Sequence, residues 1–195
     1  MTVKDIEIIL KKFRWNTLKN MYGSAHSSII GFISSGWIKQ DPSHYVLDGA
    51  PSPKTGGIRK GQVNADILLF REDVPFAVVE VETTIEKYRD KINTIFKYLN
   101  NVHDFPGIKF GLLIMTNGYT SKSHFKTYQH NWEHIKQQIK KQNHSMALVS
   151  IEKSRAQLNK STLDLLRKRN NYYPYDIKNI NYWIFNSNHV KEGKL

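Results

Sequence analysis

The stretch that most constrains the fold lies between residues 65 and 84, where two apolar segments flank a short polar one. Ala65–Phe70 and Phe76–Glu82 are rich in apolar and β-branched residues. Between them, Arg71–Pro75 is polar and ends in a proline, which cannot donate to a β-ladder. The pattern predicts two antiparallel strands joined by a five-residue loop, Arg71–Pro75.

The register of this hairpin decides where its acidic side chains lie. We expect Phe70 to face Phe76 across the loop. Asp66 then lies opposite Glu80, with roughly 4.5–5.5 Å between their Cβ atoms. Because alternate residues of a strand share a face, Glu82 projects from the same side. Three carboxylates are therefore expected at one end of the hairpin.

Such a group of acids needs compensation. Like charges on opposed residues destabilise a strand pair and raise the pKa of at least one member. Mg²⁺, with Mn²⁺ as a possible substitute, would compensate because its ligands in proteins are carboxylate oxygens and water. The alternative is an edge hairpin with a solvated, charged end. The apolar residues Ala77, Val79 and Val81 on the other face favour a covered strand, in which acids have a specific role.

The hairpin resembles the PD-(D/E)xK nuclease superfamily, the fold of restriction endonucleases and of several repair and resolvase nucleases. The matching pattern is an Asp heading one strand, a turn, a second strand ending in two acids one residue apart, and a helix. The matching residues are Asp66, Glu80, Val81 and Glu82. The resemblance implies that Asp66, Glu80 and the main-chain carbonyl of Val81 ligate the metal.

Two positions depart from the family pattern. Ala65 replaces the usual Pro before the Asp. This change is minor, because the Pro has no chemical role in the family. Glu82 stands where the family usually has Lys, an ExE form similar to that of some restriction enzymes. Glu82 could ligate the metal or accept a proton, but an ionised carboxylate cannot donate to a phosphate. A lysine from elsewhere, or a second metal, is therefore required.

A helix expected directly after the hairpin offers that lysine. Thr83 and Glu86 form a Thr-x-x-Glu capping box, and an apolar stripe follows as far as about Asn100. Lys87 and Lys91 lie one turn apart on another face, from which either could stabilise charge on a phosphate. For each lysine the alternative is an ordinary surface position.

The amino-terminal segment predicts another helix, Thr2–Met21, which begins with a Thr-x-x-Asp cap and has an apolar stripe. Glu7 lies at the border of that stripe. Because members of the superfamily often add an acid from the first helix, the resemblance makes Glu7 a fourth site carboxylate. The alternative is a surface glutamate.

The charge of the chain favours a polyanionic partner. Its 195 residues include 29 Lys and Arg against 17 Asp and Glu, a net charge of +12. A field of this sign attracts nucleic acid, and DNA is the partner that the resemblance implies. The positive charge is dispersed, however, so ribosomal-type binding, contact with a membrane surface or simple solubility would give the same composition.

Two groups of basic residues stand out along the chain. The first lies in a Gly- and Pro-rich loop leading to Asp66, where it can meet phosphates or remain solvated. The second precedes the aromatic segment NNYYPY, a composition that suits either DNA or an oligomer contact, such as that of the homodimers common among restriction enzymes. The groups are Lys54, Arg59 and Lys60, and Arg167, Lys168 and Arg169.

Several classes are excluded. Without cysteines, no disulfide framework can form. Without a signal core or a membrane-length apolar run, we expect an intracellular protein with no membrane association. Pro53 stands where a phosphate-binding P-loop requires glycine, which argues against a nucleotide cofactor.

The alternation of strands and helices predicts an α/β fold with a mixed central β-sheet flanked by helices, restriction-endonuclease-like by resemblance. Residues 1–151 form the expected core, and residues 152–195 form an extension that is either separate or part of the same domain. The expected function is a Mg²⁺-dependent DNA endonuclease of the restriction, repair or junction-resolving type. The alternatives are a catalytically inactive nucleic-acid-binding protein with this fold and a structural protein whose acids bind a stabilising cation.

Overall fold

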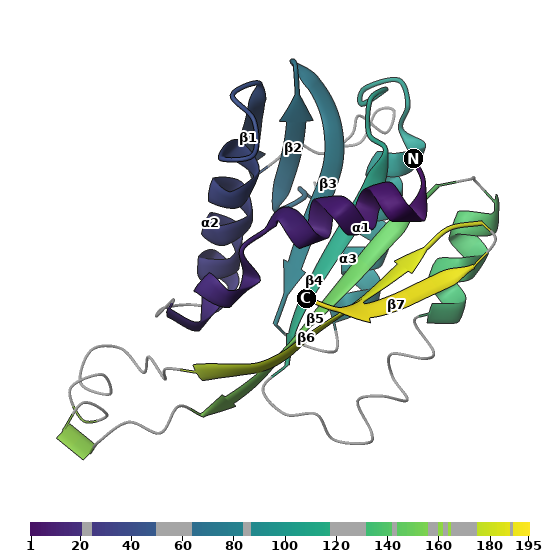
Figure 1. The fold of residues 1–195 in the computed structure, drawn as a ribbon. Coiled ribbons are helices and arrows are strands. Elements are labelled where there is room, and N and C mark those ends of the chain that lie inside the picture. Colours follow the sequence, from purple (N-terminus) through teal and green to yellow (C-terminus); the bar gives the residue numbers. More distant parts are fainter. Residues whose placement is uncertain are drawn as a thin grey trace.

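One β-sheet organises the chain, and its strands pair in sequence order (Figure 1). This computed structural model describes residues 1–20, 25–49, 64–83, 87–117, 132–141, 144–155, 160–161, 164, 175–187 and 189–195. Its seven strands are β1 (His44–Asp48), β2 (Ile67–Arg71), β3 (Val74–Glu82), β4 (Phe110–Asn117), β5 (Met146–Arg155), β6 (Tyr175–Phe185) and β7 (Val190–Lys194). Strands β3, β4 and β5 run parallel, whereas the other neighbours pair antiparallel. The α/β class with a mixed sheet is confirmed.

Helices cover both faces of the sheet (Figure 1). They are α1 (Val3–Lys12), the 3₁₀ helix η1 (Trp15–Asn20), α2 (Ala25–Ile38) and α3 (Tyr88–Asn100), and residues 132–141 are also helical. The core on one face joins α1, η1 and α2 to Val79 and Val81 of β3. The other core joins α3 and residues 132–141 to Val78. Because Glu80 and Glu82 alternate with Val79 and Val81, they share the α3 face.

The hairpin formed by β2 and β3 has the expected register over its buried part, with Leu68 opposite Val78. The prediction is wrong near the turn. A β-bulge after Leu69 shifts the pairing, so Phe70 lies opposite Pro75 rather than Phe76. The five-residue loop is replaced by a two-residue turn, Glu72–Asp73, with φ values of 47° and 63°. Two residues of positive φ match the twist of the flanking strands, which therefore extend further toward the turn.

The amino-terminal segment does not form one helix as far as Met21. The Thr2 capping box with Asp5 is present, but α1 ends at Lys12 and Phe13 adopts an extended backbone. The Trp15 indole Nε1–H donates to the Leu10 carbonyl over 2.7 Å, which stabilises this break. Tertiary packing of the aromatic side chains therefore overrides the helical periodicity of the sequence.

Strands from both expected segments belong to the same sheet. Strand β6, from the region 152–195, pairs antiparallel with β5 along its whole length, and β7 pairs with β6 at the edge. None of the described helices combines the length and the apolar character needed to cross a lipid bilayer.

Candidate active site

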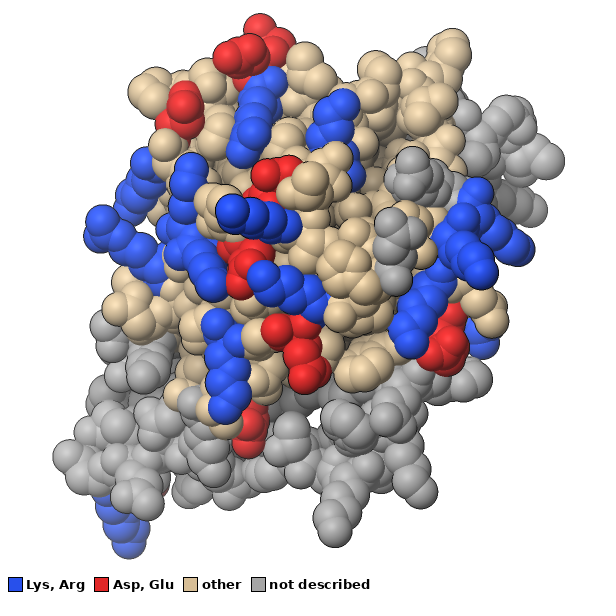
Figure 2. All heavy atoms as spheres, turned by 45° about the vertical axis from the view of Figure 1, so that its right-hand side comes forward, with Lys and Arg blue, Asp and Glu red and all other residues tan. Residues whose placement is uncertain are grey.

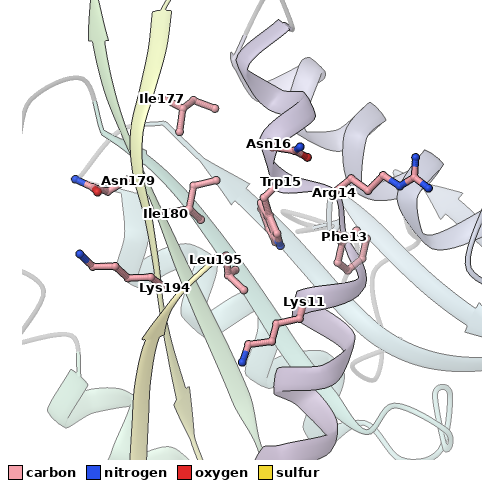
Figure 3. Close-up of a pocket in the computed structure, with 10 residues that line it drawn as sticks. All are labelled: Lys11, Phe13, Arg14, Trp15, Asn16, Ile177, Asn179, Ile180, Lys194 and Leu195. Atoms are coloured by element: carbon pink, nitrogen blue, oxygen red, sulfur yellow. The ribbon is translucent and has the colours of Figure 1, made fainter.

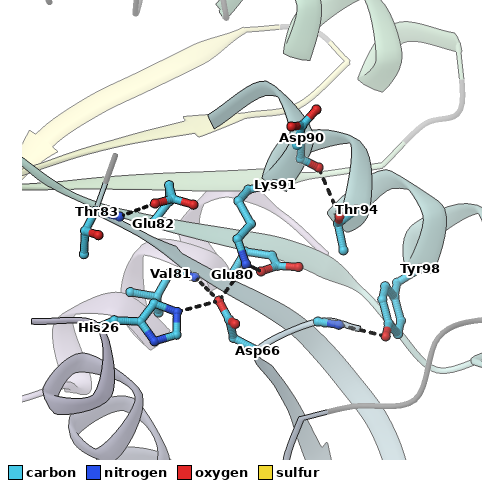
Figure 4. Close-up of polar contacts among 11 residues, drawn as sticks. His26, Asp66, Glu80, Val81, Glu82, Thr83, Asp90, Lys91, Thr94 and Tyr98 are labelled. Carbon is cyan, nitrogen blue, oxygen red and sulfur yellow. Dashed lines mark hydrogen bonds and ion pairs between the residues drawn. The ribbon is translucent and has the colours of Figure 1, made fainter. Parts of the chain in front are cut away.

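The structure brings Asp66 and Glu80 together as the register requires. Asp66 lies one residue before β2, and Glu80 lies near the end of β3 on the same face (Figure 4). The backbone N–H of Val81 donates to Asp66 Oδ2 over 2.8 Å and fixes its carboxylate beside β3. Glu80 is fully buried, whereas the Asp66 side chain retains 14% exposure. Glu80 is therefore shielded from solvent, whereas the Asp66 side chain is partly accessible to it.

Lys91 of α3 lies between the two carboxylates. Its Nζ is 2.5 Å from Glu80 Oε2 and 3.2 Å from Asp66 Oδ2 (Figure 4). The close approach of α3 to the sheet places it there. A Cβ at Gly111 of β4 would lie only 2.1 Å from Ile95 Cγ2, and Ile95 lies one helical turn after Lys91. A glycine in β4 thus allows the helix to bring its lysine to the acids.

Burial and neighbouring charges shift the pKa values of Glu80, Asp66 and Lys91 in different ways. Burial raises the pKa of Glu80 to about 8, despite the opposing hydrogen bond from Lys91. Burial alone would raise the pKa of Asp66, but the Val81 N–H, the hydrogen bond with Glu80 and the charge of Lys91 together lower it. Burial would lower the pKa of Lys91, but the hydrogen bond and charge of Glu80 and the charge of Asp66 raise it. Burial therefore disfavours the charged form of Glu80, whereas their neighbours favour the charged forms of Asp66 and Lys91.

Glu82 completes the acidic face of β3. It is 6% exposed and lies on the side of the strand that carries Glu80. The backbone N–H of Thr83 donates to Glu82 Oε1 over 2.7 Å (Figure 4). Its carboxylate is therefore oriented by the chain that leaves the sheet.

His26 is a site residue that the sequence reasoning missed. It lies in the first turn of α2, and its Nε2 is 3.4 Å from Asp66 Oδ2 (Figure 4). Its side chain is 38% exposed, so solvent reaches His26 more readily than it reaches Asp66. No motif in the sequence marks this histidine, because its neighbour in space lies far along the chain.

Helix α3 differs from expectation in its start and in which lysine it contributes. It begins at Tyr88 with Lys87 as its N-cap residue, and Lys87 makes no side-chain capping bond. The start expected at Thr83 is therefore wrong, and Glu86 lies outside the described residues. Lys87 is exposed, so the structure places Lys91, and not Lys87, beside the acids.

Glu7 is not part of the carboxylate group. It accepts a hydrogen bond from the Tyr182 hydroxyl over 2.6 Å, and it pairs with Lys11 over 2.8 Å and with Lys191. Hydrogen bonds from Lys11, Lys191 and Tyr182 lower the pKa of Glu7 to about 2. Because Tyr182 belongs to the core on the α1 side, Glu7 lies across the sheet from Glu80.

The other expected DNA contacts cannot be placed. Lys54, Arg59, Lys60, Arg167, Lys168 and Arg169 lie outside the described residues.

The acids fit a hard cation in part. Asp66 and Glu80 already surround one positive group, the Lys91 ammonium. Glu80 Oε1 is buried without a hydrogen-bond partner among the described residues, an arrangement that a metal ion would relieve. No set of three or more His, Asp and Glu side chains in the described ranges has the arrangement of a metal centre. Asp66, Glu80 and the Val81 carbonyl are the groups that would hold Mg²⁺.

Comparisons with known proteins do not identify a family. No protein-family model matches the chain, and no curated protein matches it. Among solved structures, the chain is similar to the YaeQ protein from Xanthomonas axonopodis pv. citri. The sequences are 6% identical, the match covers 84% of this chain and 72% of that chain, and the TM-score is 0.28. A likeness this weak carries no argument about fold or function.

Proposed function

We propose that this protein is a Mg²⁺-dependent DNA endonuclease that hydrolyses phosphodiester bonds. The observation that carries the proposal is the convergence of Asp66, which precedes β2, with Glu80 of β3 and Lys91 of α3. Two carboxylates beside a lysine combine metal ligation with a donor for a phosphate oxygen. Lys91 supplies the cation that the Glu82 position lacks. The pattern resembles the PD-(D/E)xK arrangement with its lysine moved to the following helix.

The net charge of +12 supports a nucleic-acid substrate. Figure 2 shows Lys and Arg side chains in several groups across one face, with acidic side chains among some of them. Homodimerisation, common among restriction enzymes, remains a prediction.

Each residue has a distinct role in the proposed reaction. Bound Mg²⁺ would supply a water of lowered pKa and neutralise charge on the phosphate. Asp66 holds its orientation through the Val81 N–H and provides ligand oxygens together with Glu80. Glu82 would accept a proton from the water that attacks phosphorus, and the leaving oxygen would take its proton from solvent as its bond to phosphorus breaks. Lys91 donates to the phosphate oxygen on which charge collects.

A catalytically inactive DNA-binding protein is the second candidate. The observation that favours it is the position of Lys91, whose ammonium group already supplies a positive charge between Asp66 and Glu80. Such an arrangement can stabilise the fold without taking part in a reaction. The two candidates differ in one measurable property, which is cleavage in the presence of a divalent cation.

A cleavage assay separates them. Wild-type protein is incubated with supercoiled plasmid, linear duplex and branched DNA in Mg²⁺, Mn²⁺ or EDTA. We expect cleavage only with metal, and we expect Glu80→Ala to reduce it by about 100-fold or more. Glu192→Ala is the matched control because Glu192 is exposed on β7. Salt-dependent DNA binding without cleavage by the wild type would refute the enzymatic proposal and favour the inactive DNA-binding protein.

A further inference from the structure

The Lys91 ammonium group lies where a metal ion bound by both carboxylates would lie. Its Nζ is 2.5 Å from Glu80 Oε2 and 3.2 Å from Asp66 Oδ2 (Figure 4). Mg²⁺ binds carboxylate oxygens at about 2.0–2.1 Å. An ion held by these two oxygens would therefore overlap the ammonium nitrogen. Lys91 and such an ion exclude each other from this position.

The remaining oxygen of Glu80 does not let both cations bind independently. Oε1 is buried without a hydrogen-bond partner among the described residues, so a metal ion could approach it while Lys91 stays on Oε2. The two oxygens are bonded to the same carbon, however, so the cations would be close neighbours. Because Glu80 is fully buried, little water is present to screen their repulsion. Metal binding at either oxygen therefore disfavours the position of Lys91.

Lys91 can leave the carboxylates without a movement of its helix. Its side chain is 22% exposed and has a long, flexible stem, so the ammonium group can turn toward solvent. Helix α3 itself is fixed, because Tyr88, Ile92 and Ile95 are fully buried against the sheet. Exchange of Lys91 for a metal ion thus requires a change in one side chain and not in an element of the fold.

The opposite face of the sheet offers no comparable pair of acids. The hollow shown in Figure 3 is lined by Lys11, Arg14 and Lys194, and no acidic residue is among the lining residues that the structure describes. Glu7, on the same side of the sheet, is one carboxylate that already accepts from Tyr182 and pairs with two lysines. A divalent cation is therefore expected at Asp66 and Glu80 rather than on this face.

We propose that Lys91 and a divalent cation compete for Asp66 and Glu80, and that Lys91 passes from these carboxylates to the substrate phosphate when the cation binds. The inference rests on the proposed function for the identity of the phosphate. It adds an order of events, in which the lysine becomes available to the substrate only after metal binding. Metal binding would then regulate the site as well as supply its chemistry.

Acetylation of the wild-type protein tests the exchange without a substitution. The protein is treated with acetic anhydride in EDTA or in Mn²⁺, and the modified lysines are quantified by mass spectrometry. Lys87, which is exposed on the first turn of the same segment, is the internal reference. We expect Mn²⁺ to accelerate acetylation of Lys91 several-fold relative to Lys87, because a lysine released from the carboxylates is more accessible to the reagent.

Calorimetric titration with Mn²⁺ measures the competition directly. It is carried out at about pH 8, where fewer protons compete with the metal. Lys91→Met removes the competing charge, Lys91→Arg retains a positive charge, and Lys87→Met is the control. We expect Lys91→Met to bind Mn²⁺ about tenfold more tightly than the wild type, and the other two variants to bind within about twofold of it. Melting temperatures verify that each variant is folded.

The outcomes separate the exchange from the catalytic proposal. Equal or weaker Mn²⁺ binding by folded Lys91→Met, or unchanged acetylation of Lys91, overturns the exchange even if the wild type cleaves DNA. Absence of Mn²⁺ binding by both proteins also overturns it. Tighter binding with faster acetylation supports the exchange, even if the wild type cleaves nothing and the nuclease proposal fails. If Lys91→Met does not fold, the acetylation of the wild type decides alone.

Discussion

The two oxygens of the Glu80 carboxylate have different surroundings, and this asymmetry shapes the chemistry of the candidate site. Oε2 accepts from Lys91, whereas Oε1 is buried without a partner in the described part of the chain. A buried, partly satisfied carboxyl group holds its proton more tightly than an exposed one. Cation binding must displace that proton, so metal affinity and protonation are coupled.

Metal affinity is therefore expected to rise with pH up to about 8, the pKa to which burial raises Glu80. Because one proton is released on binding, the metal affinity should rise about tenfold for each unit by which the pH increases below this pKa. Calorimetric titration with Mn²⁺ at pH values between 6 and 8 measures the effect. Over these roughly two pH units the affinity should rise about tenfold per unit. Glu80→Gln, which cannot ionise, should bind weakly with no such slope. A wild-type affinity that does not change with pH would contradict the coupling.

The same group makes the metal-free fold pH-sensitive. The unfolded chain releases the Glu80 proton near the ordinary value of 4.5, whereas the folded chain keeps it until about pH 8. Within this window the folded state binds more protons than the unfolded state. The contribution of Glu80 to the free energy of unfolding therefore falls as the pH rises. The difference between wild type and Glu80→Gln in denaturant titrations isolates this contribution from those of other groups. If Glu80 is ionised throughout the window, this difference should stay constant with pH.

Lys91 and Lys87 provide a matched pair of lysines on one helix. Lys91→Met removes the cation beside the acids and should reduce cleavage about 100- to 1,000-fold, as loss of a group that stabilises developing charge does. Lys87→Met removes an exposed N-cap residue and should leave cleavage within about twofold. Single-turnover rates on plasmid DNA measure both effects, and melting temperatures verify folding. Equal losses in the two variants would place the catalytic cation elsewhere.

At the scale of elements, the distance between α3 and β4 positions Lys91. The Tyr88, Ile92, Ile95 and Leu99 side chains bury one stripe of the helix against the sheet. Gly111 lets this stripe approach closely, since any side chain there would collide with Ile95. The orientation of the lysine therefore depends on a residue of another element.

A methyl group at Gly111 should shift the helix and with it the lysine. We expect Gly111→Ala to lower the free energy of unfolding by about 1–3 kcal/mol, the usual range for an overpacked core, and to reduce cleavage more than DNA binding. Gly31→Ala in α2 is the control, because a Cβ there meets nothing within 4 Å. It should stabilise the helix by about 0.5–1 kcal/mol. Denaturant titration and cleavage rates together test the pair, and full activity of Gly111→Ala would contradict the positional role.

Helix α1 shows how an element decides the role of a residue. Glu7 contacts Tyr182 of β6 and Lys191 of β7, and so it joins the amino-terminal helix to the last two strands. Its position at the border of the apolar stripe is equally compatible with a surface glutamate and with a site acid. Only the packing of α1 over the far strands assigns it a structural role.

At the scale of the whole molecule, the net charge of +12 is the property that favours the proposed association with DNA. Long-range attraction acts on any polyanion, whereas the proposed active site would act on one phosphodiester group. Under the proposed function, the positive charge accounts for the affinity for DNA and the candidate site accounts for cleavage.

DNA affinity should fall steeply with salt. Raising salt from about 50 to 200 mM should weaken duplex binding about 100-fold, which is the effect of roughly four phosphate contacts. Anisotropy titrations at several salt concentrations with the Glu80→Ala variant give the slope without cleavage. A slope near zero would exclude phosphate contacts as the basis of binding.

The sequence by itself determined the acidic face of the hairpin. Strand alternation and pairing are local rules, so the apolar pattern of residues 65–82 was enough to place Asp66 opposite Glu80 and Glu82 on the same side. The mixed α/β class followed in the same way from the order of strands and helices. The turn was less accessible, because the bulge after Leu69 and the positive φ at Glu72 and Asp73 depend on how the sheet twists.

Tertiary structure alone decided which distant residues meet these acids. Lys91 rather than Lys87 reaches them because α3 starts at Tyr88 and packs closely over Gly111. His26 approaches Asp66 because α2 covers the neighbouring strands, and Glu7 is held on the far side by Tyr182. The physical reason is that side chains far apart in sequence are brought together by how helices and sheets pack, whereas periodicity reports only which face of its own element a residue occupies.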